Sequence, residues 1–113
     1  MRVKRGTTSL KRRRSILKAV KGYRFGRRTK ERQAKEAIAH AGAHAFAHRR
    51  KKKNDFRRLW QIKINVLARK NGMSYSKLIG ALKKKGVGID RKILADLAEN
   101  NPDIFAKILK SLS

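Results

Sequence analysis

The densest group of chemically active side chains in this sequence is a run of five cations at residues 49–53. On a helix in water, like charges four residues apart repel each other by a few tenths of a kcal/mol, whereas a polyanion lying along the helix would attract them. The whole chain carries 33 Lys and Arg against seven Asp and Glu, a net charge of +26, with a pI near 11.7. The sequence therefore predicts a polyanionic partner, and nucleic acid is the commonest one.

Three histidines, His40, His44 and His48, recur at a spacing of four residues and so share one face of a predicted helix. The first and third would lie about 12 Å apart along the helix axis, too far to bind one metal ion together. The chain has no cysteine, and we expect no acid beside the histidines. We therefore predict no metal site. The histidines either stack on or hydrogen-bond to nucleotides, or form a polar flank of a cationic helix.

Two aromatic residues, Tyr23 and Phe25, lie between cations and next to glycines, without apolar neighbours in the sequence to bury them. This setting favours contact with a base or a sugar. Trp60 is the opposite case, because it falls at helical spacing with Phe56 and Ile64. It is expected in a hydrophobic core.

The sequence has no arrangement typical of an enzyme. It contains no glycine-rich phosphate loop followed by Lys-Ser or Lys-Thr, no grouped Ser, His and Asp, and no cofactor fingerprint. Asp96 and Glu99 are close enough in sequence to form an acid pair, but they are expected at the surface. We predict no enzymatic activity, no cofactor and no small-molecule substrate.

No apolar run approaches the length of a membrane span, and the basic start is not followed by the apolar region of a secretory signal. The sequence thus predicts no membrane partner. The lack of cysteine suits a reducing cytoplasm. A transit peptide over residues 1–28, which are rich in Arg and Ser, is the alternative.

Charge is unevenly divided along the chain. Residues 1–60 hold 22 Lys and Arg against three acids, net +19, whereas residues 61–113 hold 11 against four, net +7. In the first half we expect an extended arm over residues 1–8. A short helix should follow over residues 10–20, with Ser9 as its N-cap. Glycines at both ends of residues 22–26 then predict a bend.

A long helix is predicted over residues 27–71, which contain one glycine, no proline and many Ala, Lys, Arg and Glu. At 1.5 Å per residue it would span roughly 65 Å, so most of it should project beyond a small domain. In residues 34–48 alanine occupies nearly every second position, a slim surface that another backbone can approach closely. The pair Asn71-Gly72 should end this helix.

Apolar residues adopt helical spacing from residue 56 onward, where the end of the long helix should pack into a small domain. Phe56, Leu59 and Trp60 are expected on its core face. Three shorter helices follow, each with an apolar face and a start marked by a capping residue or a proline: residues 75–85 after Ser74, residues 91–99 after Asp90, and residues 102–112 from Pro102.

These patterns predict an all-α chain with two parts. A long basic N-terminal helical extension, residues 1–50, forms the arm that binds the polyanion. A small C-terminal helical domain, residues 51–113, includes the end of the long helix, and Ile93 and Ile104 should face its interior.

Several motifs occur in order along the chain: Lys21-Gly22-Tyr23, Asp55-Phe56-Arg57-Arg58-Leu59-Trp60, Ile64-Asn65, Asn71-Gly72-Met73-Ser74-Tyr75-Ser76 and Asp90-Arg91-Lys92-Ile93-Leu94-Ala95-Asp96-Leu97-Ala98. With these motifs the chain closely resembles, over essentially its whole length, the bacterial large-subunit ribosomal protein L-twenty family. The resemblance implies an extension buried in large-subunit ribosomal RNA, a role in early assembly of the large subunit, and neighbouring large-subunit ribosomal proteins as further partners.

The same resemblance implies a ribosome in the cytoplasm, with an organellar ribosome as the alternative. Family members also repress translation of their own messenger RNA, and the sequence leaves open whether that RNA is a partner here. The chain departs from the family where Glu31 and His44 stand in place of the usual tyrosines, while Phe46 keeps an aromatic residue. The family glycine after the Lys-Gly-Tyr motif is displaced, which leaves Phe25 in the bend.

We interpret the chain as an RNA-binding structural protein whose cations neutralise phosphates while small residues let RNA backbones approach. A DNA-compacting nucleoid-type protein would use the same charge and is the alternative. A membrane-disrupting helix would need a continuous apolar face, which residues 27–50 lack.

The residues predicted to bind RNA are Arg2, Lys4, Arg5, Lys11, Arg12, Arg13, Arg14, Lys21, Tyr23, Arg24, Arg27, Arg28, His40, His44, His48, Arg49, Arg50, Lys51, Lys52, Lys53, Arg57 and Arg58.

Overall fold

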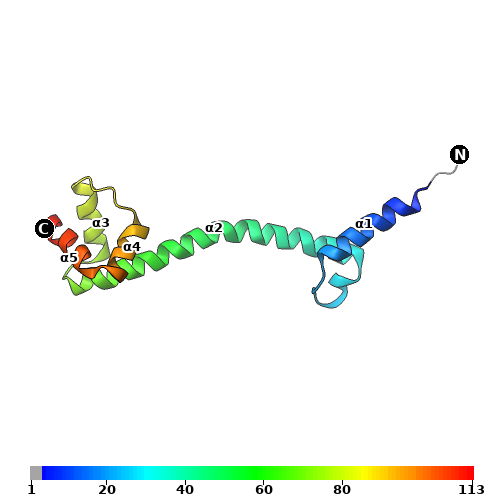
Figure 1. Cartoon of the computed structure of the whole chain (residues 1–113), viewed down its shortest axis with the longest axis horizontal. Coiled ribbons are helices and arrows are strands. Elements are labelled where there is room, and N and C mark those ends of the chain that lie inside the picture. The colour runs from blue at the N-terminus through cyan, green and yellow to red at the C-terminus, as the bar shows by residue number, and fades with distance from the viewer. Residues whose placement is uncertain (1–3) are drawn as a thin grey trace. The chain divides into compact units, whose positions relative to one another are not determined.

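The computed structural model describes residues 4–113, and every regular element in that range is helical (Figure 1). The elements in chain order are α1 (Gly6–Ala19), a 3₁₀ turn η1 (Phe25–Arg28), α2 (Glu31–Lys70), α3 (Tyr75–Lys84), α4 (Arg91–Asn100) and α5 (Pro102–Leu112). This confirms the predicted all-α fold class, with a long helix and a small C-terminal helical region. None of the described helices combines the length and the apolar character that a membrane span needs.

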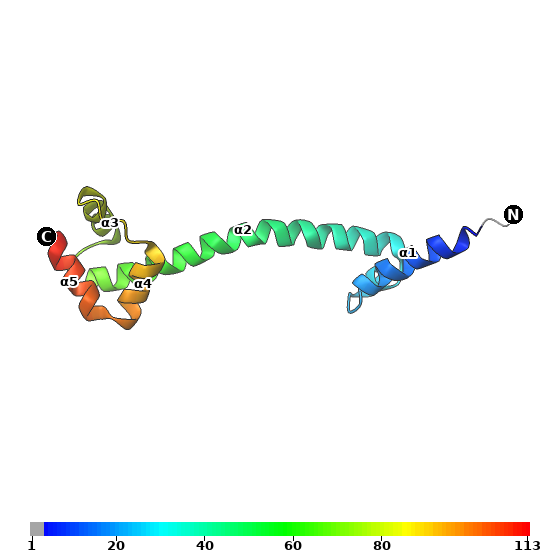
Figure 2. The same cartoon turned by 45° about the horizontal axis from the view of Figure 1, so that its top comes forward.

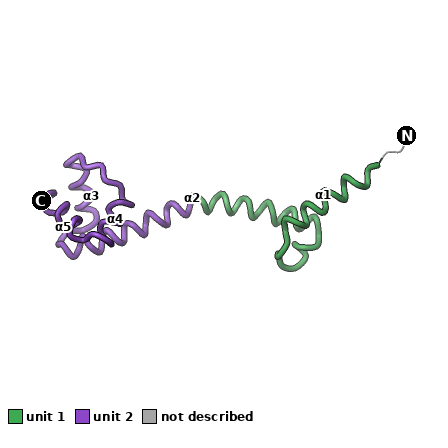
Figure 3. Tube along the Cα trace, in the orientation of Figure 1, with its two compact units in different colours: residues 1–50 green, residues 51–113 purple. Residues whose placement is uncertain are grey.

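The chain forms two compact units, residues 1–50 (unit 1) and residues 51–113 (unit 2), which are coloured separately in Figure 3. Helix α2 contributes its first part to unit 1 and its second part to unit 2. Each unit is therefore built around one part of the same helix.

Helix α1 begins earlier than the sequence predicts. Residues 6–8 are already helical, and the Ser9 hydroxyl donates a hydrogen bond to the Gly6 carbonyl oxygen at 3.1 Å. A hydroxyl that bonds back to the preceding turn is satisfied inside the helix. The predicted cap at Ser9 is therefore wrong, and so is the extended arm at residues 6–8, because helix propensity is only a weak guide to where a helix starts.

Unit 1 buries few side chains. Val20, just after α1, and Ala34, in the first turns of α2, are fully buried, while Ile16, Leu17 and Ile38 are partly buried. Both views of the fold place the end of α1 beside the start of α2 (Figures 1 and 2). The buried part of unit 1 is therefore small and lies where the two helices come together.

A tight bend joins α1 to α2. Gly22 and Phe25 have positive φ angles of 88° and 58°, and for Phe25, which carries a Cβ atom, the left-handed conformation costs about 1–2 kcal/mol. The Gly26 carbonyl oxygen then accepts hydrogen bonds from the backbone N–H groups of Thr29 and Lys30, at 3.3 and 2.9 Å. Because residues 25–28 form a 3₁₀ turn, α2 begins at residue 31, and the predicted start at residue 27 is wrong.

Helix α2 contains 40 residues, and every residue from 39 to 59 is exposed. Its C-terminal end is closed by backbone hydrogen bonds: the Met73 N–H donates to the Ala68 carbonyl oxygen and the Gly72 N–H to that of Arg69, both at 3.0 Å. Gly72 has a φ of 80°, so this is a Schellman ending with glycine in the left-handed position. The predicted stop at Asn71-Gly72 is confirmed.

Unit 2 contains the main hydrophobic core, formed where α3, α4 and α5 pack around the end of α2 (Figures 1 and 2). The Ser74 hydroxyl accepts a hydrogen bond from the Lys77 N–H at 3.4 Å, and an Asp90 carboxylate oxygen accepts one from the Arg91 N–H at 2.7 Å, so both predicted caps are confirmed. Trp60 is partly buried against the core, as predicted. The buried core residues are Ile64, Ala68, Leu78, Leu82, Leu94, Ala95, Ala98, Phe105, Leu109 and Leu112.

Four apolar residues that were expected inside the core are exposed: Phe56, Leu59, Ile93 and Ile104. The short helices cover α2 only from Trp60 onward, so Phe56 and Leu59 precede the covered part. In α4 and α5 the residues that follow, Leu94 and Phe105, point into the core, and this leaves Ile93 and Ile104 on the flanks. The expectation for these four side chains was wrong.

A chain of polar contacts fixes α3 and α4 onto α2. The Asn65 side-chain oxygen accepts hydrogen bonds from the Tyr75 N–H and from Arg69 Nε, both at 3.3 Å. The Tyr75 hydroxyl in turn accepts one from Arg91 Nε at 2.9 Å. Asn65 and Tyr75 are partly buried, so these bonds satisfy groups that water reaches poorly.

Candidate nucleic-acid interface

The residues predicted to bind RNA lie on α1 and just before it, on the bend that follows it, and on α2. All of them are exposed except Tyr23, which is partly buried, and Arg2, which lies outside the described residues. Exposed guanidinium and ammonium groups keep their donors available to phosphate oxygens. The geometry is therefore compatible with the predicted set.

The longest run of exposed residues in the described chain is in α2, at residues 39–59. It carries seven Lys and Arg and one acid, Asp55. One oxygen of that acid lies 3.9 Å from Arg58 Nη1. The charge of this segment is thus almost entirely positive, and its side chains are open to a partner.

Two phenylalanine rings in this segment lie beneath cations. The guanidinium carbons of Arg49 and Arg50 are 5.7 and 5.4 Å from the centroid of the Phe46 ring, and Lys52 Nζ is 5.9 Å from that of Phe56. Such cation–π contacts restrict the directions in which the cations point. Phe46 was not among the predicted site residues, although its spacing of three and four residues from Arg49 and Arg50 is a helical contact signal.

The three histidines lie along α2 as their spacing predicts. The ring centroids of His44 and His48 are 5.7 Å apart, whereas His40 Nε2 is 3.7 Å from Glu36 Oε1. The expectation of no acid beside the histidines is wrong for His40, because Glu36 precedes it by about one helical turn. Residues 4–113 contain no group of three side chains that could hold a metal ion.

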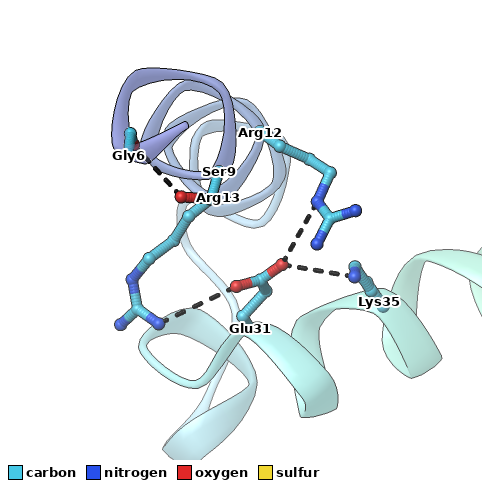
Figure 4. A network of polar contacts seen from close by, with 6 residues as sticks. All are labelled: Gly6, Ser9, Arg12, Arg13, Glu31 and Lys35. Carbon is cyan, nitrogen blue, oxygen red and sulfur yellow. Dashed lines mark hydrogen bonds and ion pairs between the residues drawn. The ribbon is translucent and has the colours of Figure 1, made fainter. Parts of the chain in front are cut away.

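One carboxylate links α1 to α2 (Figure 4). Glu31, the first residue of α2, has its oxygens 3.9 Å from Arg12 Nε, 3.9 Å from Arg13 Nη1 and 3.2 Å from Lys35 Nζ. Two of the predicted RNA-binding cations therefore share their charge with Glu31. The contact also holds α1 close to the start of the long helix.

An open cleft of about 810 Å³ lies between the bend and the first turns of α2. It brings together three predicted site residues, Tyr23, Arg27 and His40, with Phe25, which was also expected to contact a base or sugar, and it adds Gln33, Glu36 and Ala37, which were not predicted to be part of the site. The lining residues are Tyr23, Phe25, Arg27, Gln33, Glu36, Ala37 and His40.

Arg57 and Arg58 are exposed on α2 just before the covered part of the helix. Trp60 packs against the core of unit 2 two residues after Arg58. These two arginines thus stand next to a side chain that packs on the main core, whereas no residue of α1 itself is buried.

The chain matches the family model described as ribosomal protein L20 over residues 2–108. It is 50% identical over 109 residues to the large ribosomal subunit protein bL20 of Chloroflexus aggregans, an alignment that covers 96% of this chain and 92% of the relative. It is 49% identical over 112 residues to the protein of the same name from Crocosphaera subtropica, covering 99% and 96%. The chain therefore belongs to the ribosomal protein L20 family, the L-twenty family that its motifs resemble, and is a structural protein of the large ribosomal subunit rather than an enzyme.

Proposed function

We propose that the protein binds large-subunit ribosomal RNA directly and promotes early assembly of the large subunit. The observation that carries this proposal is the exposed segment of α2, residues 39–59, which carries seven Lys and Arg and one acid and contributes no side chain to the hydrophobic core. Packing within the chain does little to stabilise a helix of this charge. A phosphate backbone neutralises its cations and is therefore the partner that we infer.

The mechanism combines charge neutralisation with close approach. Lys and Arg side chains contact phosphates, which allows RNA segments that repel each other to come together. Between residues 39 and 47 the exposed positions include five alanines and Gly42, which keep the helix slim. The cations therefore attract the RNA while the small residues leave room for its backbone.

The partners that follow from this function are large-subunit ribosomal RNA and neighbouring ribosomal proteins, in a ribosome of the cytoplasm. The protein's own messenger RNA is a further candidate partner, since other members of the family repress their own translation. Binding to that RNA would use the same cations.

Competition separates this function from DNA compaction. The full-length chain is bound to labelled large-subunit ribosomal RNA, and either unlabelled ribosomal RNA or duplex DNA of equal total charge is added at one salt concentration. We expect ribosomal RNA to compete at least about tenfold better, because shape and base contacts add to the charge. Equal competition would favour the nucleoid-type alternative.

Reconstitution tests the assembly role. Large subunits are assembled from ribosomal RNA and purified proteins with this protein either present or left out. We expect its omission to block an early particle rather than the last step. Normal assembly kinetics without it would contradict the proposal.

A further inference from the structure

The cleft between the bend and α2 contains an aromatic ring in an unfavourable position. The Phe25 side chain is 84% exposed, and its backbone has a φ of 58°. The left-handed backbone of a phenylalanine is strained, and exposure of its apolar ring to water is unfavourable. Nothing in the described chain offsets the backbone strain or covers the ring, which indicates a partner outside it.

The cleft also holds an acid that has no Lys or Arg partner in the described part of the chain. Of the two acids in the described part of unit 1, Glu31 is engaged by Arg12, Arg13 and Lys35. Glu36 contacts only His40, at 3.7 Å, and its side chain is 71% exposed. An acid on a surface that faces phosphates is repelled by them, unless it accepts hydrogen bonds from N–H groups of the RNA itself.

Guanine fits an exposed carboxylate best among the four RNA bases. Its Watson–Crick edge presents two adjacent donors, N1–H and N2–H, which match the two oxygens of a carboxylate. Adenine and cytosine place an acceptor nitrogen beside their amino group, and uracil places carbonyl oxygens on both sides of its single donor. Only guanine therefore satisfies both oxygens without setting a lone pair against the negative charge.

We propose that this cleft captures one unpaired guanine of the bound RNA, an inference that rests on the RNA binding proposed above. Tyr23 and Phe25 stack on the base and Glu36 accepts its N1–H and N2–H groups. Gln33 lies against the bend, since a Cβ atom on Gly26 would come within 2.5 Å of its Oε1 atom, and its amide reaches the remaining O6 edge. Arg27, on the rim of the same cleft, contacts the adjoining phosphate.

Three short RNAs of equal length and charge test base recognition by the full-length chain. One is an oligouridine with a single central guanine, the second has inosine in place of that guanine, and the third is uridine throughout. Counterion release is the same for all three, so affinity differences report the base. We expect the guanine RNA to bind about tenfold tighter than the inosine RNA, which lacks the N2 amine. Equal affinity for guanine and inosine would overturn the proposal.

The Glu36→Gln variant separates two interpretations through the ratio of guanine to uridine affinity. If Glu36 is simply a solvated acid, removing its negative charge tightens binding to all three RNAs about equally, and the ratio stays unchanged. If it reads guanine, the guanine RNA loses about tenfold in affinity relative to the uridine RNA. The matched control is Asp55→Asn, the same charge change on α2 outside the cleft, which should leave the ratio of guanine to inosine affinity unchanged.

The Phe25→Gly variant separates the role of the ring from the stability of the bend. Glycine adopts a φ of 58° without strain, so the bend should form at least as readily as in the wild type. Loss of a stacking ring should nevertheless weaken binding of the guanine RNA by about fivefold or more. Unchanged affinity would exclude Phe25 as a stacking surface.

Chemical probing of large-subunit ribosomal RNA with kethoxal, which modifies N1 and N2 of unpaired guanines, tests the site in the full complex. We expect one guanine to be protected by the wild type and by Asp55→Asn but reactive with Glu36→Gln. If no guanine differs while ribosomal RNA still outcompetes duplex DNA, this inference alone is overturned. Loss of that preference for ribosomal RNA would instead overturn the proposed function.

Discussion

At the scale of single residues, α2 shows how sharply exposure changes over two positions. Ile62 is 61% exposed and Ile64 is fully buried in the core of unit 2. Two residues correspond to about 200° of rotation around a helix, so the two side chains point in nearly opposite directions. Chemically identical side chains therefore provide a matched pair for mutation.

We expect Ile64→Ala to lower the free energy of unfolding of unit 2 by about 2–5 kcal/mol, because it leaves a cavity in the core. The control Ile62→Ala should change it by no more than about 0.5 kcal/mol. Urea denaturation of the full-length chain measures both, with fluorescence of Trp60, the sole tryptophan, as the probe. Similar losses for the two variants would contradict the burial described for α2.

Asn65 and Asn54 form a second matched pair on α2, with polar side chains. The Asn65 side-chain oxygen accepts hydrogen bonds from the Tyr75 N–H and Arg69 Nε, so Asn65→Ala should destabilise unit 2 by about 1–2 kcal/mol. Asn54 is exposed on the same helix, and Asn54→Ala should leave stability unchanged or slightly higher, since alanine favours helix. The same urea experiment compares them, and an Asn65→Ala variant as stable as the wild type would show that these bonds contribute little.

At the scale of elements, the two groups of cations on α1 and α2 should contribute differently to RNA recognition. Arg57 and Arg58 stand just before Trp60, which packs on the core, whereas Lys11 and Arg12 belong to a helix held by few buried side chains. Positioned cations discriminate between RNA shapes better than mobile ones, which mainly supply charge.

We therefore expect the double variant Arg57→Ala with Arg58→Ala to reduce discrimination between large-subunit ribosomal RNA and a generic duplex. The double variant Lys11→Ala with Arg12→Ala should weaken binding to both RNAs about equally. Affinities for both ligands at one salt concentration give the comparison. If the two double variants lost the same fraction of affinity for each ligand, a distinct role for Arg57 and Arg58 would be excluded.

Elements whose ends depend on local chemistry were predictable from the sequence. Gly72, Ser74 and Asp90 mark helix ends through hydrogen bonds to their own neighbours, and the structure confirms all three. The start of α2 was not predictable in the same way, because Arg27 and Arg28 are residue types that favour a helix but belong to a 3₁₀ turn. The exposure of Phe56 and Leu59 was also missed, since periodicity marks a helix face but not how far neighbouring helices cover it.

The candidate site was predictable only in part. Positive charge identifies the predicted cations on α1 and α2 without any structure, and all of these are exposed. The cleft was not foreseen, because Glu36 and Gln33 come from α2 while Tyr23 and Phe25 come from the bend. Their proximity depends on how the chain turns between the two elements, which spacing within one helix does not encode.

At the scale of the whole molecule, the two units differ in how much they bury. Unit 2 has a cluster of ten buried apolar residues, while in the described part of unit 1 Val20 and Ala34 are buried. Burial on that scale cannot offset the conformational entropy of ordering about 50 residues of high positive charge. The units should therefore respond differently to the removal of RNA.

We expect residues 1 to about 50 to be largely disordered in the RNA-free protein and unit 2 to remain folded. Amide hydrogen exchange on the full-length chain, free and bound to ribosomal RNA, would show it as protection that appears in unit 1 only on binding. Strong uniform protection from residue 10 onward in the free protein would contradict this prediction.

The charge of unit 1 should also dominate the salt dependence of binding. Each phosphate contact contributes about 0.7–0.9 to the slope of log affinity against log salt concentration. Deletion of residues 1–47 should therefore flatten the slope by several units, as measured by titrations over a range of salt concentrations. An unchanged slope would place the RNA-binding surface elsewhere.

The alternating alanines of α2 have a geometric consequence. Because each residue turns the helix by about 100°, Ala39, Ala43 and Ala47 fall along one side, and Ala41 and Ala45 fall along the nearly opposite side. All five are exposed. The thickness of the helix across these two sides is set by the backbone and a methyl group. We therefore expect this stretch of α2 to act as a thin spacer between two RNA segments, which approach it from opposite sides, rather than as a rod with a single binding side.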